Sequence, residues 1–443
     1  MMHARMDTPS ADSSANKETA SPGPASGAAP SLTDGAKKIN LYLLFLIVVI
    51  DLLGFGIVLP LLPLYAKKLH ASPLDIGLLM ASFSAMQFLF APVWGRLSDR
   101  IGRRPVLLAG LGGSVVFYSM FGVASIYESL PLLFVARIGA GICGATISTT
   151  QASVADSTGL EGRARGMALI GAAFGIGFTF GPVLGGLVTR YEKVILGKEY
   201  ALNTMPGFVA AALSLIAWLI CLIKLEESHK PGAASAGTGH RQLINIKALR
   251  EAIANPALGP LLLIFFLAIF AFAQFETTLS LLGNDSFNLD QEHVLYLFCY
   301  IGFSLSLIQG GLVRFLAPKL GEAPMTIMGA AFMTIGLFLI SLSAAYASLT
   351  MLYCVIPVAV CGFAFLTPSI QSLISRRTDP ERQGEMLGLA QSASSLSRIL
   401  GPCVSNALYP FGAALTYKVA SGLAALSFLM AVMSVRKGRD FGK

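Results

Sequence analysis

The chain has 443 residues, of which 54% are hydrophobic and only 13% are charged, and its formal net charge is +8. Soluble domains carry about 25% charged residues, so this composition, with a mean hydropathy of +0.69, excludes an ordinary water-soluble protein. Much of the surface must face a medium other than water.

The first 38 residues are predicted to form a disordered cytoplasmic tail. Residues 1–36 are rich in Ala, Ser, Pro and Gly, a composition that cannot bury enough apolar surface to fold. The first apolar segment is too long and starts too far from the N-terminus to be a signal peptide.

Twelve apolar segments follow. About 20 residues suffice to cross the hydrocarbon core of a bilayer, and the many Gly and Pro residues within the segments are tolerated by membrane helices. The sequence therefore predicts an all-α polytopic membrane protein with twelve transmembrane helices. The predicted segments are 39–66, 75–94, 104–126, 131–154, 164–189, 205–224, 257–282, 293–316, 324–346, 349–374, 384–410 and 413–435.

A polar stretch, HKPGAASAGTGHRQ at 229–242, divides the chain into two sets of six segments. We expect two pseudo-symmetric six-helix bundles and a short C-terminal tail. Their predicted limits are 39–225 for the first bundle, 226–256 for the cytoplasmic central loop, 257–436 for the second bundle and 437–443 for the tail.

The two halves also share sequence. GRLSDRIGRRP at 95–105 aligns without gaps to RFLAPKLGEAP at 314–324, which pairs Gly102 with Gly321, and the dipeptide GP recurs at 181–182 and 401–402. An internal duplication of a six-helix unit is typical of secondary transporters, whose binding site lies between the repeats.

Lys and Arg gather in the tails and in the even-numbered connections, which the positive-inside rule places in the cytoplasm together with both termini. The positive charge therefore reports membrane topology, and no nucleic-acid partner is expected. The six Cys residues lie within or at the ends of apolar segments without metal-ligand spacing, so we predict no metal site.

Four stretches resemble motifs of the major facilitator superfamily, in its twelve-span drug:proton antiporter branch that includes the tetracycline-efflux proteins. They are GRLSDRIGRRP at 95–105, LFVARIGAGICGA at 133–145, GAAFGIGFTFGPVLGG at 171–186 and DLLGFGIVLPLLPLY at 51–65. The resemblance implies a monomeric, non-enzymatic transporter of a bacterial inner membrane, driven by the proton gradient without a cofactor and acting on a small molecule.

The first motif is expected to form a cytoplasmic gate. Glycine permits a tight turn and close helix approach, and the resemblance implies that Asp99 contacts the start of the eleventh span near 384–387 and that Asp156 pairs with Arg100 or Arg103. Anchoring by positive charge alone is the alternative. The second copy has Pro318 and Glu322 in place of gate residues, which predicts a weaker or different contact. The predicted gate residues are Gly95, Asp99, Arg100, Gly102, Arg103, Arg104 and Asp156.

Ionisable residues inside a membrane span are costly and mark function by default. Asp51 lies about 18 Å along its helix, at 1.5 Å per residue, and is predicted to carry a proton or a substrate cation, or else to form a static ion pair with Arg137. Glu276 is either a substrate or proton carboxylate or an outer-gate partner of Arg398. Arg398 either lines the cavity or binds backbone carbonyls.

Two further sets are predicted. Gln151 and Gln274 are candidate cavity residues, although each is more often a simple interhelical hydrogen bond. The antiporter motif, Gly177, Gly181, Pro182, Gly185 and Gly186, is expected to form a close, kinked contact between the halves that resists proton leak. The alternative is generic packing of small residues.

The sequence thus predicts a proton-coupled antiporter that exports small amphipathic compounds or drugs by alternating access. The alternative within the same fold is a dedicated metabolite or sugar exporter or a proton symporter. An acidic residue in the ninth span and a histidine in the eighth, present in tetracycline-efflux proteins, are absent, which argues against tetracycline as the cargo. A membrane-embedded enzyme is disfavoured because the paired acids lack a nearby base.

Overall fold

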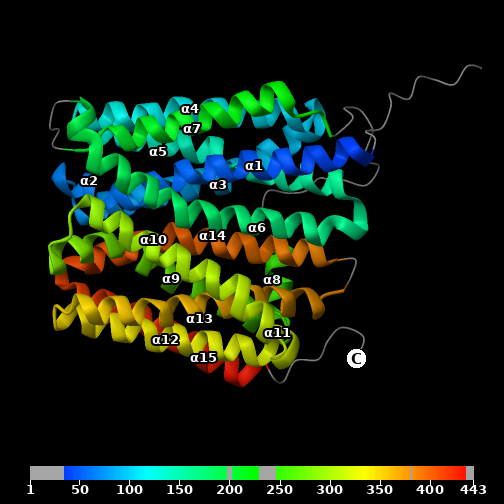
Figure 1. Ribbon diagram of the computed structural model, residues 1–443. Helices are drawn as coiled ribbons and strands as arrows, with labels where there is room; N and C mark the ends of the chain where they lie inside the picture. The colour runs from blue at the N-terminus through cyan, green and yellow to red at the C-terminus, as the bar shows by residue number, and fades with distance from the viewer. Residues whose placement is uncertain (1–33, 197–201, 229–245, 380–381, 436–443) are drawn as a thin grey trace, which may run out of the picture.

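The computed structural model describes residues 34–196, 202–228, 246–379 and 382–435, and every regular element in this part of the chain is helical. The helices run side by side along one axis (Figure 1). Of the tail predicted to be disordered over 1–38, residues 1–33 lie outside the described residues, and residues 34–38 are not disordered but form the start of a helix. The whole of 229–242 and the predicted C-terminal tail, 437–443, also lie outside the described residues.

The first half contains six crossings. The first crossing is built from α1 (Asp34–Val58), the 3-10 turn Leu59–Leu61 and α2 (Leu62–Lys68). It is followed by α3 (Pro73–Ile101), α4 (Arg103–Ile126), α5 (Leu130–Gly144), α6 (Ile147–Leu196) and α7 (Met205–Lys224). The long α6 carries the end of the fourth crossing and all of the fifth.

The second half begins with the short helix α8 (Ile246–Ala254), which lies inside the predicted central loop. The eighth crossing includes a π-helical segment, Ile308–Val313, between α10 and α11. The remaining helices are α9 (Gly259–Phe287), α10 (Gln291–Leu307), α11 (Arg314–Leu320), α12 (Glu322–Ala345), α13 (Leu349–Arg376), α14 (Gln383–Leu408) and α15 (Ala413–Ser434).

Within the described residues, eleven helices are long and apolar enough to cross a membrane, one fewer than the twelve predicted segments. The missing crossing is α14, which is 26 residues long but interrupts its apolar sequence with Gln, Ser, Arg and Asn. It packs against α3 of the first half and α9 of its own half, so protein contacts rather than lipid accommodate part of this polar surface.

The duplication is visible in the backbone. Gly102 and Gly321 both have positive φ, +103° and +77°, and each starts a helix of 24 residues. At the opposite end of the bundles, His70 and Asn288 both take positive φ just before a capped helix start. Equivalent turns in the two halves therefore have equivalent geometry.

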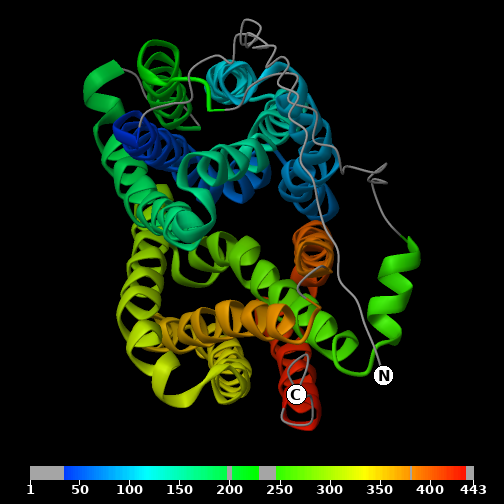
Figure 2. The same ribbon diagram turned by 90° about the vertical axis from the view of Figure 1, so that its right-hand side faces the viewer.

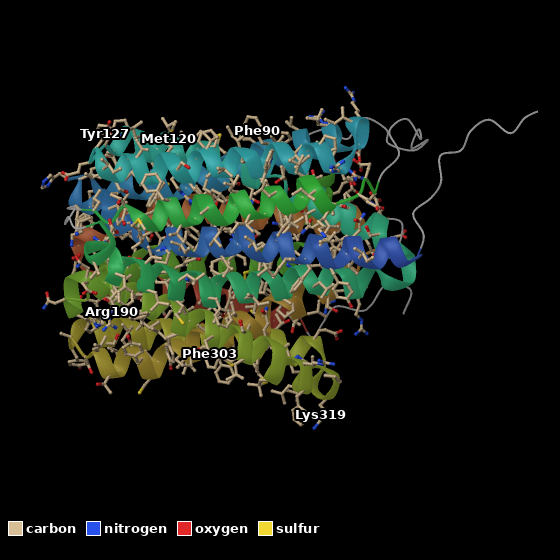
Figure 3. All side chains as sticks on the ribbon, turned by 45° about the horizontal axis from the view of Figure 1, so that its top comes forward. Phe90, Met120, Tyr127, Arg190, Phe303 and Lys319 are labelled. Atoms are coloured by element: carbon tan, nitrogen blue, oxygen red, sulfur yellow. The ribbon has the colours of Figure 1, made fainter. Side chains whose placement is uncertain are left out.

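The two halves meet mainly along two helix pairs, α3 with α14 and α6 with α10, with a smaller contact of α2 on α9. Figure 2, a view along the helices, shows α1–α7 on one side of this boundary and α8–α15 on the other. We name the two ends of the bundle after the predicted topology. The inner end carries the start of α1 and Lys319, and the outer end carries Tyr127 and Arg190 (Figure 3).

The surroundings of the gate glycines Gly95 and Gly102, and of Gly321 in the second half, differ in a way that can be tested. A Cβ added at Gly102 would lie 2.4 Å from the Glu227 carboxylate, whereas Gly95 and Gly321 have nothing within 4 Å. We expect Gly102→Ala to lower the melting temperature most, since it combines backbone strain of about 1–3 kcal/mol with a displaced carboxylate. Gly321→Ala should show the backbone cost alone.

Gly95→Ala is the matched control, because Gly95 lies inside α3 and Ala in a helix interior is favoured over Gly by up to about 1 kcal/mol. Thermal unfolding of the purified variants in detergent measures all three. Equal melting temperatures for Gly102→Ala and Gly95→Ala would contradict the assignment.

Candidate functional site

Arg103 organises a charged cluster at the inner end. Its guanidinium bonds the carboxylates of Asp99 at 2.7 Å and Asp156 at 3.0 Å, and also donates to the Ser98 hydroxyl at 2.7 Å. Arg103 is buried and the three partners come from α3 and α6. The cluster therefore ties three segments of the first half together.

Glu227, which the gate prediction omitted, completes this cluster. Its carboxylate oxygens accept the backbone N–H groups of Arg103 at 2.8 Å and Arg104 at 3.0 Å. These N–H groups belong to the first turn of α4, where a helix has unpaired donors and a partial positive charge. Gly102 leaves room for this approach, so a glycine at that position is the sequence signal that a neighbouring group comes close.

Other gate residues depart from the prediction. The Asp99 side chain is 54% exposed and bonds Arg103, rather than lying against the start of α14. Gly95 faces open space, so it does not mediate a close helix approach. Arg100 is exposed, and Arg104 donates to the Leu222 carbonyl at 2.6 Å. The side chains of Arg103 and Arg104 thus bond residues of the first half.

The second half has a counterpart with the charges reversed. Glu322 occupies the position of Arg103 after the equivalent glycine, and its carboxylate bonds Arg376 of α13 at 2.9 Å and Ser372 at 3.1 Å. Lys319 lies over the ring of Phe315 instead of joining this pair. The predicted different contact near Lys319 thus takes the form of a reversed ion pair.

At the outer end, two ion pairs join the halves. Lys67 of α2 pairs with Asp285 of α9, and Arg190 of α6 lies 3.7 Å from Glu292 of α10. In both pairs the base belongs to the first half and the acid to the second. We call these four residues the outer lock. None of these four residues was predicted from the sequence to have a functional role.

Asp51 and Arg137 lie in the interior of the first half. The Asp51 carboxylate accepts a long hydrogen bond from Ser214 of α7 at 3.4 Å, and Tyr118 lies within electrostatic range of both charged residues. No ion pair within 4 Å joins them in the described part of the chain. The alternative of a static ion pair is therefore wrong for this conformation.

Arg137 is 2% exposed and rests on aromatic rings. Its guanidinium carbon lies 4.6 Å from the centre of the Phe83 ring and 5.9 Å from that of Phe55. Two of its nitrogens, Nε and Nη1, have no hydrogen-bond partner among the described residues. Cation–π contacts compensate only part of the cost of burying this charge, which makes Arg137 responsive to any anion that approaches.

The second half brings Glu276 and Arg398 into electrostatic range of each other without an ion pair within 4 Å. Arg398 is exposed on α14 and Glu276 is half-buried on α9. Gln151 is exposed, whereas Gln274 is fully buried with both amide atoms lacking partners. Gln274 is thus a buried polar group and not a cavity-lining one in this conformation.

The glycines of α6 serve two contacts, which corrects the predicted single contact between halves. Gly177 and Gly181 approach α1 of the same half, at Leu52 and Gly56. Gly185 and Gly186 lie against Leu295 and Tyr296 of α10, in the other half. Pro182 lies within α6, which continues through it.

The role of Glu227 can be tested with its neighbour as control. Glu227→Gln removes the negative charge from the α4 N-terminus and should cost about 1 kcal/mol, measured as a lower melting temperature. Glu226→Gln should have no effect, because Glu226 contacts Asn40 through its backbone. A larger loss for Glu226→Gln than for Glu227→Gln would contradict the capping role.

Comparison with known proteins agrees with this arrangement. The sequence model of the Major Facilitator Superfamily matches residues 44–402. The chain is 32% identical to the class E tetracycline resistance protein of Escherichia coli, over 82% of this chain and 86% of that protein. It is 28% identical to Major facilitator superfamily domain-containing protein 10 of Mus musculus, over 87% and 91% of the two chains.

The fold is similar to the crystal structure of the human organic anion transporter MFSD10 (TETRAN), with a TM-score of 0.66 and 26% identity over 89% of this chain and 99% of that one. This chain is a multi-pass membrane protein and belongs to the major facilitator superfamily of transporters.

Proposed function

We propose that the protein exports small organic compounds in exchange for protons, by alternating access between two conformations. The observation that carries the proposal is the asymmetry between the two ends. The outer lock joins the halves, whereas at the inner end Arg103 bonds Ser98, Asp99 and Asp156, which all belong to the first half. Such an arrangement corresponds to a transporter closed on the outside.

Helix packing supports the same interpretation. Near the outer end, a Cβ added at Gly77 would lie 2.8 Å from the backbone of Cys403, and one at Gly186 would lie 2.7 Å from the Tyr296 ring. Nearer the inner end, a Cβ added at Gly171 of α6, at Gly310 of the π-helical segment or at Gly388 of α14 would have nothing within 4 Å. The interface between the halves is therefore tight outside and loose inside.

We expect the exposed Asp99 side chain to gain a contact in the conformation that is closed at the inner end. Closing the inner end would bring the first turn of α14 toward α3, and a carboxylate is stabilised at a helix N-terminus by unpaired N–H groups. Asp99 would then exchange solvent for this contact while Arg103 remains held by Asp156. The inner cluster would serve as the gate of that second conformation.

Asp51 is the proposed proton carrier. A carboxyl group in a membrane interior is costly in its charged form, and the long bond from Ser214 compensates that cost only weakly. Arg137 and Asp51 share Tyr118 as a neighbour, so a change in helix position alters the field that each exerts on the other. Proton binding and helix movement would thereby be coupled.

The relatives favour export of organic compounds and differ in cargo, since one group is named for tetracycline resistance and the other for organic anions. Tetracycline itself is disfavoured here by the missing acid and histidine in the ninth and eighth spans. A dedicated metabolite exporter or a proton symporter is the second candidate, because the same fold and the same intramembrane charges serve either direction of coupling.

The outer lock can be tested by exchanging its charges. Lys67→Asp or Asp285→Lys places like charges together and should open the outer end, whereas the double variant should restore closure. Distances between spin labels at Leu74→Cys and Ser286→Cys, in a background without native Cys, measure the outer separation. Failure of the double variant to restore the short distance would argue against a lock held by charge.

Proton coupling can be tested in everted membrane vesicles with an imposed proton gradient and a pH dye. A panel of lipophilic cations, anions, neutral drugs and sugars is added in turn. A substrate should release protons in the wild type and not in Asp51→Asn. Glu128→Gln, an exposed acid at the outer end, is the matched control and should behave as wild type. Full coupling in Asp51→Asn would move the proton site elsewhere, with Glu276 next.

A further inference from the structure

The side of α14 that faces the other half carries polar residues within the membrane. One face of this helix packs on α9, where Ser397 donates to the Phe266 carbonyl and Gly401 lies against Ala273. A second face exposes Leu396 and Leu400, as expected for contact with lipid. Between these faces lies a third, and it is polar.

The first half covers this third face near the outer end of α14, and the face is exposed nearer the inner end. Pro402 and Cys403 lie against Gly77 of α3 in the first half. One turn inward from Pro402, Arg398 is exposed; Ser395 is half-exposed about two turns inward, and Gln391 is exposed about three turns inward. The same face that contacts the first half near the outer end therefore looks into the space between the halves nearer the inner end.

Arg398 is the charged group on this face. It forms no hydrogen bond or ion pair with any described residue, and the acid within electrostatic range is Glu276. It lies about 22 Å from the inner end of α14 and about 15 Å from the outer end, at 1.5 Å per residue. An unpaired guanidinium at this depth requires water or an anionic ligand.

We infer that Arg398, on a polar face with Gln391 and Ser395, binds the anionic group of the transported compound and selects organic anions over cations. The inference rests on the proposed export function and names its substrate class. Guanidinium binds a carboxylate through two parallel N–H bonds, while neighbouring Gln and Ser side chains supply further hydrogen bonds. The Glu276 carboxylate repels the same anion, because both groups are negatively charged.

The test uses the full-length protein in lipid nanodiscs and three probes with one apolar body: 1-naphthoate, 1-naphthylmethylammonium and 1-naphthalenemethanol. Equilibrium binding should be tightest for naphthoate. Arg398→Gln should weaken naphthoate binding by at least about tenfold, the scale of a charged hydrogen bond, and leave the alcohol unchanged. Arg398→Lys should retain part of the affinity.

Glu276→Gln should act in the opposite direction and strengthen naphthoate binding, which keeps the inference testable if Arg398→Gln does not fold. Arg314→Gln, an exposed arginine on α11, is the matched control and should leave binding unchanged. Tighter binding of the ammonium probe, no binding of naphthoate, or unchanged naphthoate binding in Arg398→Gln would overturn the inference. Binding requires no proton gradient, so this outcome is independent of the vesicle experiment on coupling.

Discussion

Lys67 and Arg190 on one half pair with Asp285 and Glu292 on the other, and in the proposed transport cycle the conformation of the molecule depends on these contacts at the outer end. Once the outer ends are held together, α3 and α14 and α6 and α10 pack closely there and diverge toward the inner end. That divergence exposes the polar face of α14 and leaves Asp99 in solvent. In the proposed cycle, a few side chains at the outer end would thus determine which residues deep in the bundle are accessible.

The fold was largely predictable because its signals are local. Apolar segments of membrane-spanning length and the matched turns at Gly102 and Gly321 lie within short stretches of sequence. The one segment that fails the apolar criterion, α14, shows why such counting is incomplete. A helix at the boundary between two halves can be polar on the faces that other helices or water cover, and sequence hydropathy does not distinguish those faces.

The site was predicted in part. Its residues could be named from motifs, and Arg103 does pair with Asp156. Glu227 could not be assigned to the gate, because its partners lie 124 and 123 residues earlier in the chain and no periodicity links them. The direction in which the Asp51 side chain points could not be predicted from the sequence either. A helix position fixes depth in the membrane, whereas only packing decides that Asp51 faces Ser214 of α7 rather than Arg137.

Lys67 and Asp285 lie close to the same turn in the two halves. His70 and Asn288 mark the same turn in the two halves, and Lys67 and Asp285 each lie three residues before it. They are therefore equivalent positions that meet across the pseudo-twofold axis. In a symmetric dimer of two identical halves, a residue on the axis meets its own copy, which would set lysine against lysine or aspartate against aspartate. If the halves arose by duplication, this contact became attractive only once the copies had diverged, and unlike charges at these positions favour the pairing of unlike halves over that of like ones.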